Sequence, residues 1–398
     1  MTLRILHIAD VHIGDRRYGR WDPTRSVNSR LDDQRKCLSY LSNKAIEEKA
    51  HAVVIAGDIY HTKSPTPSEE DVFAEFIAQL SENGIHIFAI AGNHERPTSP
   101  GRASPLTHID TLKIPFFHLF TSAGVKSIDI GDETISVVGI PWPLRSEMEA
   151  AGFPIKDLSA NSLVWDKYIS DLLNRLVAEI PENSIPILTA HLWTANIAGC
   201  GRYNIRGEPV CRAETLVRVP FRYIALGHVH SHNIVWNSPL ALYSGSIDRT
   251  DFTESKEKKG AILVEIDGDL TSWTFIETPA RPFISIEMDL SGFPKPTESV
   301  LERVRSLDLE GAILRILITQ QKGDPPIDGR NIRPKLTKPF HIQVLRKVVS
   351  EDDKSLLFKA FTPFSALEEY MKRTPEYLPY KDKLMELARL IAEEVSER

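Results

Sequence analysis

The stretch LRILHIADVH, residues 3–12, carries the pattern that decides the fold, because an apolar run is followed at once by aspartate and histidine. The same pattern returns in AVVIAGDIYH at residues 52–61 and in IHIFAIAGNHE at residues 85–95. Short apolar runs rich in β-branched residues predict buried strands. Amphipathic stretches lie between them, so the alternation predicts an α/β fold whose strands end at polar residues.

Two of these amphipathic stretches, residues 31–49 and 68–80, have the apolar spacing of helices. A third predicted helix covers residues 163–180. Further strands are predicted at residues 134–140, 185–190, 223–226, 233–236, 240–243 and 261–266. The sequence therefore predicts a mixed α/β core with helices outside.

The pattern changes near Pro279–Pro282, after which a smaller α/β unit is expected. Its predicted elements are strands at residues 283–290, 312–319 and 340–349, a helix at 298–307 and a basic linker at 322–339. Charged helices are predicted beyond it at 365–372 and 381–394. We therefore expect three domains, at residues 1–280, 281–349 and 350–398.

Composition excludes several classes of protein. With 398 residues, 42% of them apolar and 26% charged, the chain is long and apolar enough to fold around a real core. It contains no run of eighteen apolar residues, so no membrane span is expected, and its first residues lack a signal-peptide pattern. Three cysteines favour a reducing cytoplasm. The net charge of −6 argues only mildly against a nucleic-acid partner.

Polar motifs follow five of the predicted strands, and each offers Asp, Asn or His. They are Asp10-Val11-His12, Gly57-Asp58, Gly92-Asn93-His94-Glu95, His191 and Gly227-His228-Val229-His230. One such motif is usually a turn, but five together predict a binuclear metal centre, in which a carboxylate can bridge two cations. The mixed ligands suit manganese, iron, cobalt or zinc better than calcium. Two ions about 3.5–4 Å apart can clamp a phosphate and activate water.

This motif order resembles the calcineurin-like metallophosphoesterase superfamily over roughly residues 1–280. The resemblance implies a core of two packed mixed β-sheets flanked by helices, with two divalent cations, most simply Mn²⁺. It implies that one ion is held by Asp10, His12, Asp58 and His230, and the other by Asp58, Asn93, His191 and His228. It also implies that His94 contacts the substrate phosphate or protonates the leaving oxygen. Attack would come in line from a hydroxide that bridges the two metals.

The continuation Gly57-Asp58-Ile59-Tyr60-His61 resembles the SbcD-type DNA repair nucleases, whereas protein phosphatases continue with Val-Asp-Arg-Gly. Tyr243–Ile247, Asp251-Phe252-x-Glu254 and Arg281-Pro282-Phe283 also match that group. The resemblance implies exonuclease and endonuclease activity in double-strand-break repair. It places His61 near the metals, where it assists exonuclease action.

The same resemblance implies further partners. Residues 281–349 would cap DNA, and the helical tail at 350–398 would bind an SMC-like ATPase of the SbcC type. A homodimer would form through helices of the nuclease domain, with 31–49 and 68–80 as candidates by position. The chain has no Gly-Lys-Ser/Thr element, so ATP dependence would come from the partner. DNA ends, duplex or single-stranded, are the expected substrate, and the expected location is cytoplasmic and nucleoid-associated.

Basic residues predict where DNA would be contacted. Arg16, Arg17 and Arg20 lie in one loop with Tyr18 and Trp21, and arginine with aromatics suits a nucleic-acid strand. The same loop could equally be an ordinary solvated surface. Arg202 follows His191 closely enough to line the same cleft. The basic stretch at 322–338 could face DNA or the protein partner.

Two other functions remain open on the sequence alone. One is a phosphodiesterase of the same superfamily that acts on cyclic or small nucleotide substrates, which leaves the basic loop and the tail without a role. The other is a scaffold that clamps an ATPase without cutting DNA, which the intact set of predicted ligands disfavours. Metal content and activity on DNA distinguish these alternatives.

Overall fold

The computed structural model describes residues 1–97, 103–153, 162–195, 208–327, 329–349, 371 and 379–396. The chain divides into two compact units. The first consists of residues 1–285, 309–314 and 338–342, and the second of residues 286–308, 315–337 and 343–398. The domain boundaries at 280 and 349 stay predictions.

The first unit contains two six-stranded sheets, and the first of them has the order β16-β15-β1-β4-β5-β6. Strands β1, β4, β5 and β6 are parallel, whereas β15 pairs antiparallel with both β1 and β16. The strands span β1 (Leu3–Ile8), β4 (Ala52–Ile55), β5 (His86–Ile90), β6 (Phe117–Phe120), β15 (Gly260–Asp267) and β16 (Leu270–Glu277).

The second sheet has the order β13-β14-β12-β9-β8-β7. Strands β8, β9, β12 and β14 run parallel, and the edge strands β7 and β13 are antiparallel to their neighbours. The strands span β7 (Gly124–Ile130), β8 (Glu133–Ile140), β9 (Ile185–His191), β12 (Tyr223–Gly227), β13 (Asn233–Asn237) and β14 (Leu240–Tyr243). Both sheets are therefore mixed.

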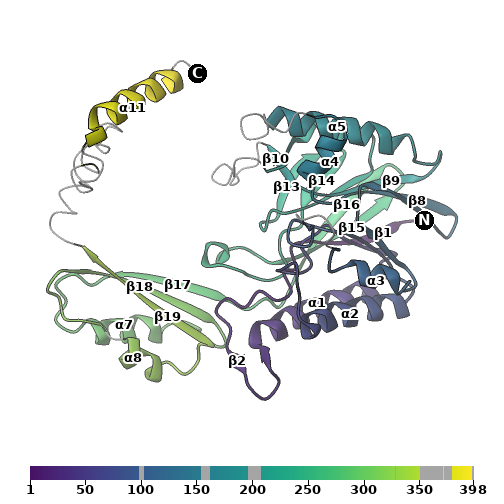
Figure 1. Cartoon of the computed structure of the whole chain (residues 1–398). Coiled ribbons are helices and arrows are strands. Elements are labelled where there is room, and N and C mark those ends of the chain that lie inside the picture. Colours follow the sequence, from purple (N-terminus) through teal and green to yellow (C-terminus); the bar gives the residue numbers. More distant parts are fainter. Residues whose placement is uncertain are drawn as a thin grey trace. The chain divides into compact units, whose positions relative to one another are not determined.

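The two sheets pack face to face because alternate residues of each strand point to opposite faces. Ile5 and Val54 of the first sheet share one buried cluster with Leu242 of the second. The opposite face of the first sheet packs on helices α1 (Ser29–Glu47) and α2 (Pro67–Glu82), which lie side by side beside it (Figure 1). Helix α5 (Ser162–Val177) covers the second sheet. This four-layer arrangement confirms the predicted fold class.

The second unit contains most of a smaller sheet with the order β17-β18-β19, whose strands each begin in residues of the first unit. Its strands are β17 (Phe283–Asp289), β18 (Ile313–Gln321) and β19 (His341–Val349), and its helices include α7 (Pro296–Arg305) and α11 (Lys381–Ser396). The stretch expected as a basic linker, residues 322–339, instead contains α8 (Gly329–Ile332) and the 3₁₀ turn η3 (Arg333–Lys335). Ile332 is fully buried, so at least one apolar side chain anchors this stretch. Apart from Met371, the helix expected at 365–372 lies outside the described residues.

Several short or edge elements are absent from the sequence-based prediction. Among them, β7 and β16 alternate apolar with polar residues and are only partly buried, so they lack the apolar run used to find strands. Within the described part of the chain, no helix has the length and apolar character needed to cross a membrane. The other short elements are β2 (Trp21–Asp22), β3 (Val27–Asn28), α3 (Thr107–Thr111), α4 (Arg145–Ala150), β10 (Trp193–Ala195), β11 (Val210–Arg212), α6 (Ala213–Val217) and η2 (Phe252–Glu254).

Candidate metal centre

The loops that follow the parallel strands of both sheets are joined by hydrogen bonds at one place. The Asp10 amide donates to the Gly57 carbonyl over 3.1 Å, which ties the loop after β1 to the loop after β4. The His228 amide donates to the Asp10 carboxylate over 3.0 Å, which adds the loop after β12 of the second sheet. The carboxyl ends of parallel strands lie at the same edge of a sheet, so the five motifs converge there.

A first group of possible ligands consists of Asp10, His12 and His230, whose ligand atoms all lie within 4.8 Å of one another. The Nε2 atoms of His12 and His230 are 2.9 Å apart. Asp10 and His12 are buried, and His230 is partly exposed. The sequence separates His12 from His230 by more than two hundred residues, so the group is made by the packing of the two sheets.

A second group consists of Asp58, His191 and His228. The Asn93 side-chain oxygen joins it, 3.0 Å from His191 Nε2 and 3.1 Å from His228 Nδ1. Asp58 Oδ2 lies 3.4 Å from His191 Nε2 and 3.8 Å from His12 Nε2. Asp58 is therefore placed between the two groups, where one carboxylate can reach a cation in each.

The side chains of the two groups suit bound cations because lone pairs on their nitrogen and oxygen atoms face one another. His191 Nδ1 lies 2.7 Å from the Ala56 carbonyl, which can only accept, so His191 donates there and its Nε2 presents a lone pair to the Asn93 oxygen. His230 Nδ1 likewise lies 2.9 Å from the Glu254 carboxylate, which leaves its Nε2 facing His12. A proton or a cation between such atoms removes the repulsion, and Asp, Asn and His together suit transition-metal ions.

Burial and the surrounding charges shift the pKa values of the two carboxylates in opposite directions. Burial raises the pKa of Asp10. Burial also opposes ionisation of Asp58, but the neighbouring imidazoles of His191, His12 and His94 bring its pKa below the usual value. In the absence of metal, burial disfavours the charged form of His191, but Asp58 and Asp10 outweigh this and raise its pKa to about 9. The centre is therefore arranged to hold positive charge beside Asp58.

Four of the predicted ligands have an unusual backbone conformation. Asp10, His12, Asp58 and His228 all have positive φ angles, between 50° and 102°, although none is glycine. Residues other than glycine adopt this region at a cost in energy, and a cluster of them is typical of functional sites, although six others lie elsewhere among the described residues. The backbone hydrogen bonds between the loops hold these conformations in place, so the fold stores strain at four of the predicted ligands.

Gly57 has a close contact that only glycine allows. Its φ is +91°, and a Cβ atom there would lie 2.3 Å from His191 Nδ1. We expect Gly57→Ala to destabilise the metal-free protein for two reasons. An alanine in the left-handed backbone conformation costs roughly 1–2 kcal/mol, and the clash of its Cβ atom with His191 costs about 1–3 kcal/mol more. Gly84→Ala is the control. Gly84 has a φ of +70° and open space around the added Cβ atom, so this variant should show only the cost of the left-handed conformation. Urea unfolding measures both, and equal losses would contradict the close packing around His191.

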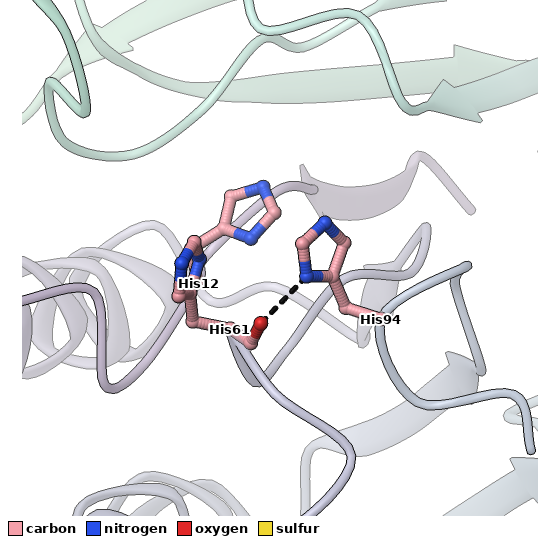
Figure 2. A group of neighbouring side chains, drawn as sticks. All are labelled: His12, His61 and His94. Carbon is pink, nitrogen blue, oxygen red and sulfur yellow. Dashed lines mark hydrogen bonds between the residues drawn. The ribbon is translucent and has the colours of Figure 1, made fainter.

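A third group lies beside the first and consists of His12, His61 and His94. His94 Nδ1 lies 2.6 Å from the His61 carbonyl oxygen, to which it can only donate, so the lone pair of this ring is on Nε2 (Figure 2). The rings of His61 and His94 are stacked with centroids 5.3 Å apart, and the His12 ring lies 4.8 Å from that of His94. The two residues predicted to be catalytic thus lie next to the possible metal ligands, and the Nε2 atom of His94 is not used by the contact with His61.

The arginines predicted to contact DNA have partners within the chain. Arg16 pairs with Glu69 at 2.8 Å, Arg17 pairs with Asp15 at 2.8 Å, and the Arg20 guanidinium lies 4.8 Å from the centre of the Phe340 ring. Arg16 and Arg17 are still about half exposed. Arg202 lies outside the described residues. The loop is therefore an ordered part of the first unit, and its contact with DNA stays a prediction.

Two buried residues behind His230 have no role assigned from the sequence. Glu254 accepts from His230 Nδ1 and, over 3.0 Å, from the Lys259 ammonium group. Lys259 has a fully buried side chain and also donates to Glu257 over 2.8 Å and to the His230 carbonyl over 2.9 Å. Glu254 ends the Asp251-Phe252-x-Glu254 motif, but nothing local indicates that Lys259 is buried. An ionised second layer of this kind orients a metal-binding imidazole.

Comparison with known proteins agrees with this geometry. The calcineurin-like phosphoesterase family matches residues 3–232, more than half of the chain, so the chain belongs to that family. This confirms the resemblance found in the motifs, and the protein is a phosphoester hydrolase. The family uses a binuclear centre of divalent metal ions, for which the two groups described above are the candidates.

Relatives with known names are similar over larger parts of the chain. The SbcD subunit of the nuclease SbcCD from Bacillus subtilis is 28% identical over 280 residues, which is 68% of this chain and 68% of the relative. The DNA double-strand break repair protein Mre11 of Methanocaldococcus jannaschii is 25% identical over 72% of this chain and 69% of its own. The protein of that name from Sulfolobus acidocaldarius is 24% identical over 96% of this chain and 92% of its own.

Proposed function

We propose that this protein is a metal-dependent DNA nuclease that hydrolyses phosphodiesters with exonuclease and endonuclease activity in double-strand-break repair. The observation that carries the proposal is the position of Asp58, whose carboxylate lies between the two groups of possible ligands. The names of the relatives in Bacillus subtilis and Methanocaldococcus jannaschii support DNA as the substrate.

In this proposal Asp10, His12 and His230 would hold one divalent cation, Asn93, His191 and His228 would hold the other, and Asp58 would serve as a ligand in both groups. Bound cations of this kind, manganese in our proposal, neutralise the charge of a phosphodiester and lower the pKa of water. The chain itself fixes the phosphate between the two groups. In this role His94 carries a proton on both ring nitrogens: Nδ1–H donates to the His61 carbonyl, and Nε2–H gives its proton to the leaving oxygen. His61 positions the end of the DNA strand.

We expect His94→Ala to reduce DNA cleavage about 10²–10⁴-fold, the usual contribution of a positioned acid or base, while the manganese content stays unchanged. Digestion of linear duplex DNA gives the activity, and elemental analysis of the dialysed protein gives the metal content. The matched control is His118→Ala, on β6, whose ring contacts His86 and Phe88 instead of the metal-binding residues. Near-normal cleavage by the His94 variant would remove it from the mechanism.

A second histidine variant separates the two nuclease activities. We expect His61→Ala to reduce exonuclease activity more than endonuclease activity, because we place His61 at the strand end and His94 at the scissile phosphate. Release of mononucleotides from linear DNA and nicking of covalently closed circular DNA measure the two activities. Equal losses in both assays would contradict this division of roles.

The remaining features give the proposed nuclease its partners. We infer that the loop with Arg16, Arg17 and Arg20 contacts the DNA backbone, together with Arg202, and that residues 281–349 cap the DNA. The tail at 350–398 would bind an SMC-like ATPase. The name of the Bacillus relative supports a protein partner, since that name denotes one subunit of a complex. We also propose that the protein forms a homodimer through α1 or α2. We propose that it acts at the nucleoid in the cytoplasm.

One experiment tests the proposed function against its alternatives. The purified protein is loaded with manganese and given linear duplex DNA or bis-p-nitrophenyl phosphate. Cleavage of both is expected, and chelation should abolish both. Cleavage of the small ester alone would favour a small-substrate phosphodiesterase, and bound manganese without either activity would favour a scaffold.

A further inference from the structure

Two tryptophans lie against the second group of possible ligands, and the proposed mechanism gives them no role. The ring of Trp142 is centred 4.8 Å from the His228 ring, and that of Trp193 is 4.7 Å from it. Trp142 also lies 6.0 Å from His191. Both indoles are partly exposed, unlike Trp165, which is 1% exposed in the core. A partly open aromatic surface therefore borders the place where we expect the phosphate.

Both indoles are held by rigid backbone. Trp142 stands between Pro141 and Pro143 directly after β8, and its amide donates to the Ala91 carbonyl over 2.9 Å. Trp193 opens β10, and its indole Nε1 donates to Glu208 over 2.5 Å. A flat ring fixed in advance loses little conformational freedom when a ligand stacks on it. The pair is thus suited to bind another flat ring.

The position of the indoles relative to His94 decides which ring that would be. In the described structure, the His94 ring contacts His12 and His61, whereas the two indoles contact His191 and His228. The two sets of aromatic side chains therefore border different groups of possible ligands, with Asp58 between them. A phosphodiester bound at these groups carries one nucleoside on each side of its phosphorus atom. If the leaving nucleoside lies at His94, the tryptophans border space on the other group where the second nucleoside can lie.

We propose that Trp142, together with Trp193, forms a base-binding subsite that stacks the nucleobase on the side of the scissile phosphate away from His94. The inference rests on the proposed nuclease function and adds a contact to the substrate beyond its phosphate. Stacking on an aromatic side chain tolerates every base, since each has a flat π surface. The subsite therefore selects nucleotides over other phosphoesters without selecting a sequence.

Binding of two small ligands tests this subsite directly. Calorimetry with the manganese-loaded protein compares dAMP with 2-deoxyribose 5-phosphate, which has the same sugar phosphate but no base. We expect the wild type to prefer dAMP by roughly 5- to 150-fold, the range that base stacking supplies. Trp142→Leu should bring the ratio close to one without changing the affinity for the sugar phosphate. Trp142→Phe should keep part of the preference.

A control and a parallel assay keep the outcomes distinct. Trp273→Leu removes a partly exposed indole that contacts His232 instead of His228, and it should leave the ratio unchanged. Equal loss of affinity for both ligands in Trp142→Leu would overturn the subsite and show that the indole only supports His228. A wild type that cuts linear DNA without preferring dAMP would also overturn it. A wild type that prefers dAMP but cuts no DNA would overturn the nuclease function and keep the subsite.

Discussion

Replacing Asp58 by asparagine should abolish DNA cleavage, with a loss of at least about 1000-fold in rate, because it removes several kcal/mol of charge stabilisation at the reacting phosphate. The side chain keeps its size but loses the charge that faces His12, His94 and His191. The content of bound manganese should fall in parallel. Elemental analysis and digestion of labelled duplex DNA measure the two effects.

The matched control for this variant is Asp269→Asn. Asp269 lies in the exposed turn between β15 and β16, where it pairs with Arg222 at the surface. Its replacement should leave both metal content and cleavage unchanged. If the Asp58 variant kept two manganese ions per chain and cleaved DNA at the normal rate, the bridging position of Asp58 would be wrong.

The second large effect concerns the buried charges behind His230. Replacing Glu254 by glutamine should weaken manganese binding about 10- to 100-fold, as loss of a carboxylate that orients a metal-binding imidazole does. It should also destabilise the metal-free protein by about 1–3 kcal/mol, because Lys259 loses the more buried of its two carboxylate partners. Metal titration and urea unfolding give the two quantities.

Glu257→Gln provides the comparison. Glu257 also accepts from Lys259 and is more exposed than Glu254, whereas the ring nitrogen of His230 pairs with Glu254. We expect the Glu257 variant to weaken the Lys259 network without a comparable loss of manganese affinity. Equal losses of metal affinity in the two variants would mean that Glu254 acts through Lys259 rather than by orienting His230.

The same carboxylate predicts a dependence on pH. Burial opposes ionisation of Glu254, but the hydrogen bond from His230 and the charge of Lys259 bring its pKa below the usual 4.5. A lowered pKa in the folded state adds stability that is present above pH about 4.5 and is lost as the pH falls towards the folded-state pKa. The stability difference between wild type and Glu254→Gln, measured on metal-free protein, should therefore shrink as the pH is lowered from about 5 to about 3. A constant difference would contradict the role of this charge.

The sequence was most informative where the chain is buried on both faces. Strands β1, β4 and β5 are apolar along their length because helices cover one face and the second sheet covers the other, so their ends could be located closely. The polar residues after such ends stand out against the apolar run. This contrast is why candidate ligands could be selected from local pattern, although their coming together depends on how the two sheets pack.

Contacts made only by tertiary packing could not be predicted from the sequence. Lys259 looks like one more charged residue in a Lys-rich turn, and only the fold shows that its ammonium group is enclosed by Glu254, Glu257 and a carbonyl. Trp142 follows strand β8 just as the ligands follow theirs, but an aromatic residue after a strand gives no local signal of a binding site. Arg16 stands out in the sequence as an unpaired cation, yet Glu69, which is 53 residues away along the chain, lies beside it in the structure.

In the proposed function, the metal centre formed by the two groups of possible ligands cuts DNA. The most direct measurement is the digestion of end-labelled linear duplex DNA by the purified protein, with manganese, with chelator, and with the Asp58→Asn variant. We expect labelled products only for the wild type with manganese. A wild type that binds two manganese ions per chain and hydrolyses bis-p-nitrophenyl phosphate, but leaves the DNA intact, would contradict the proposed function.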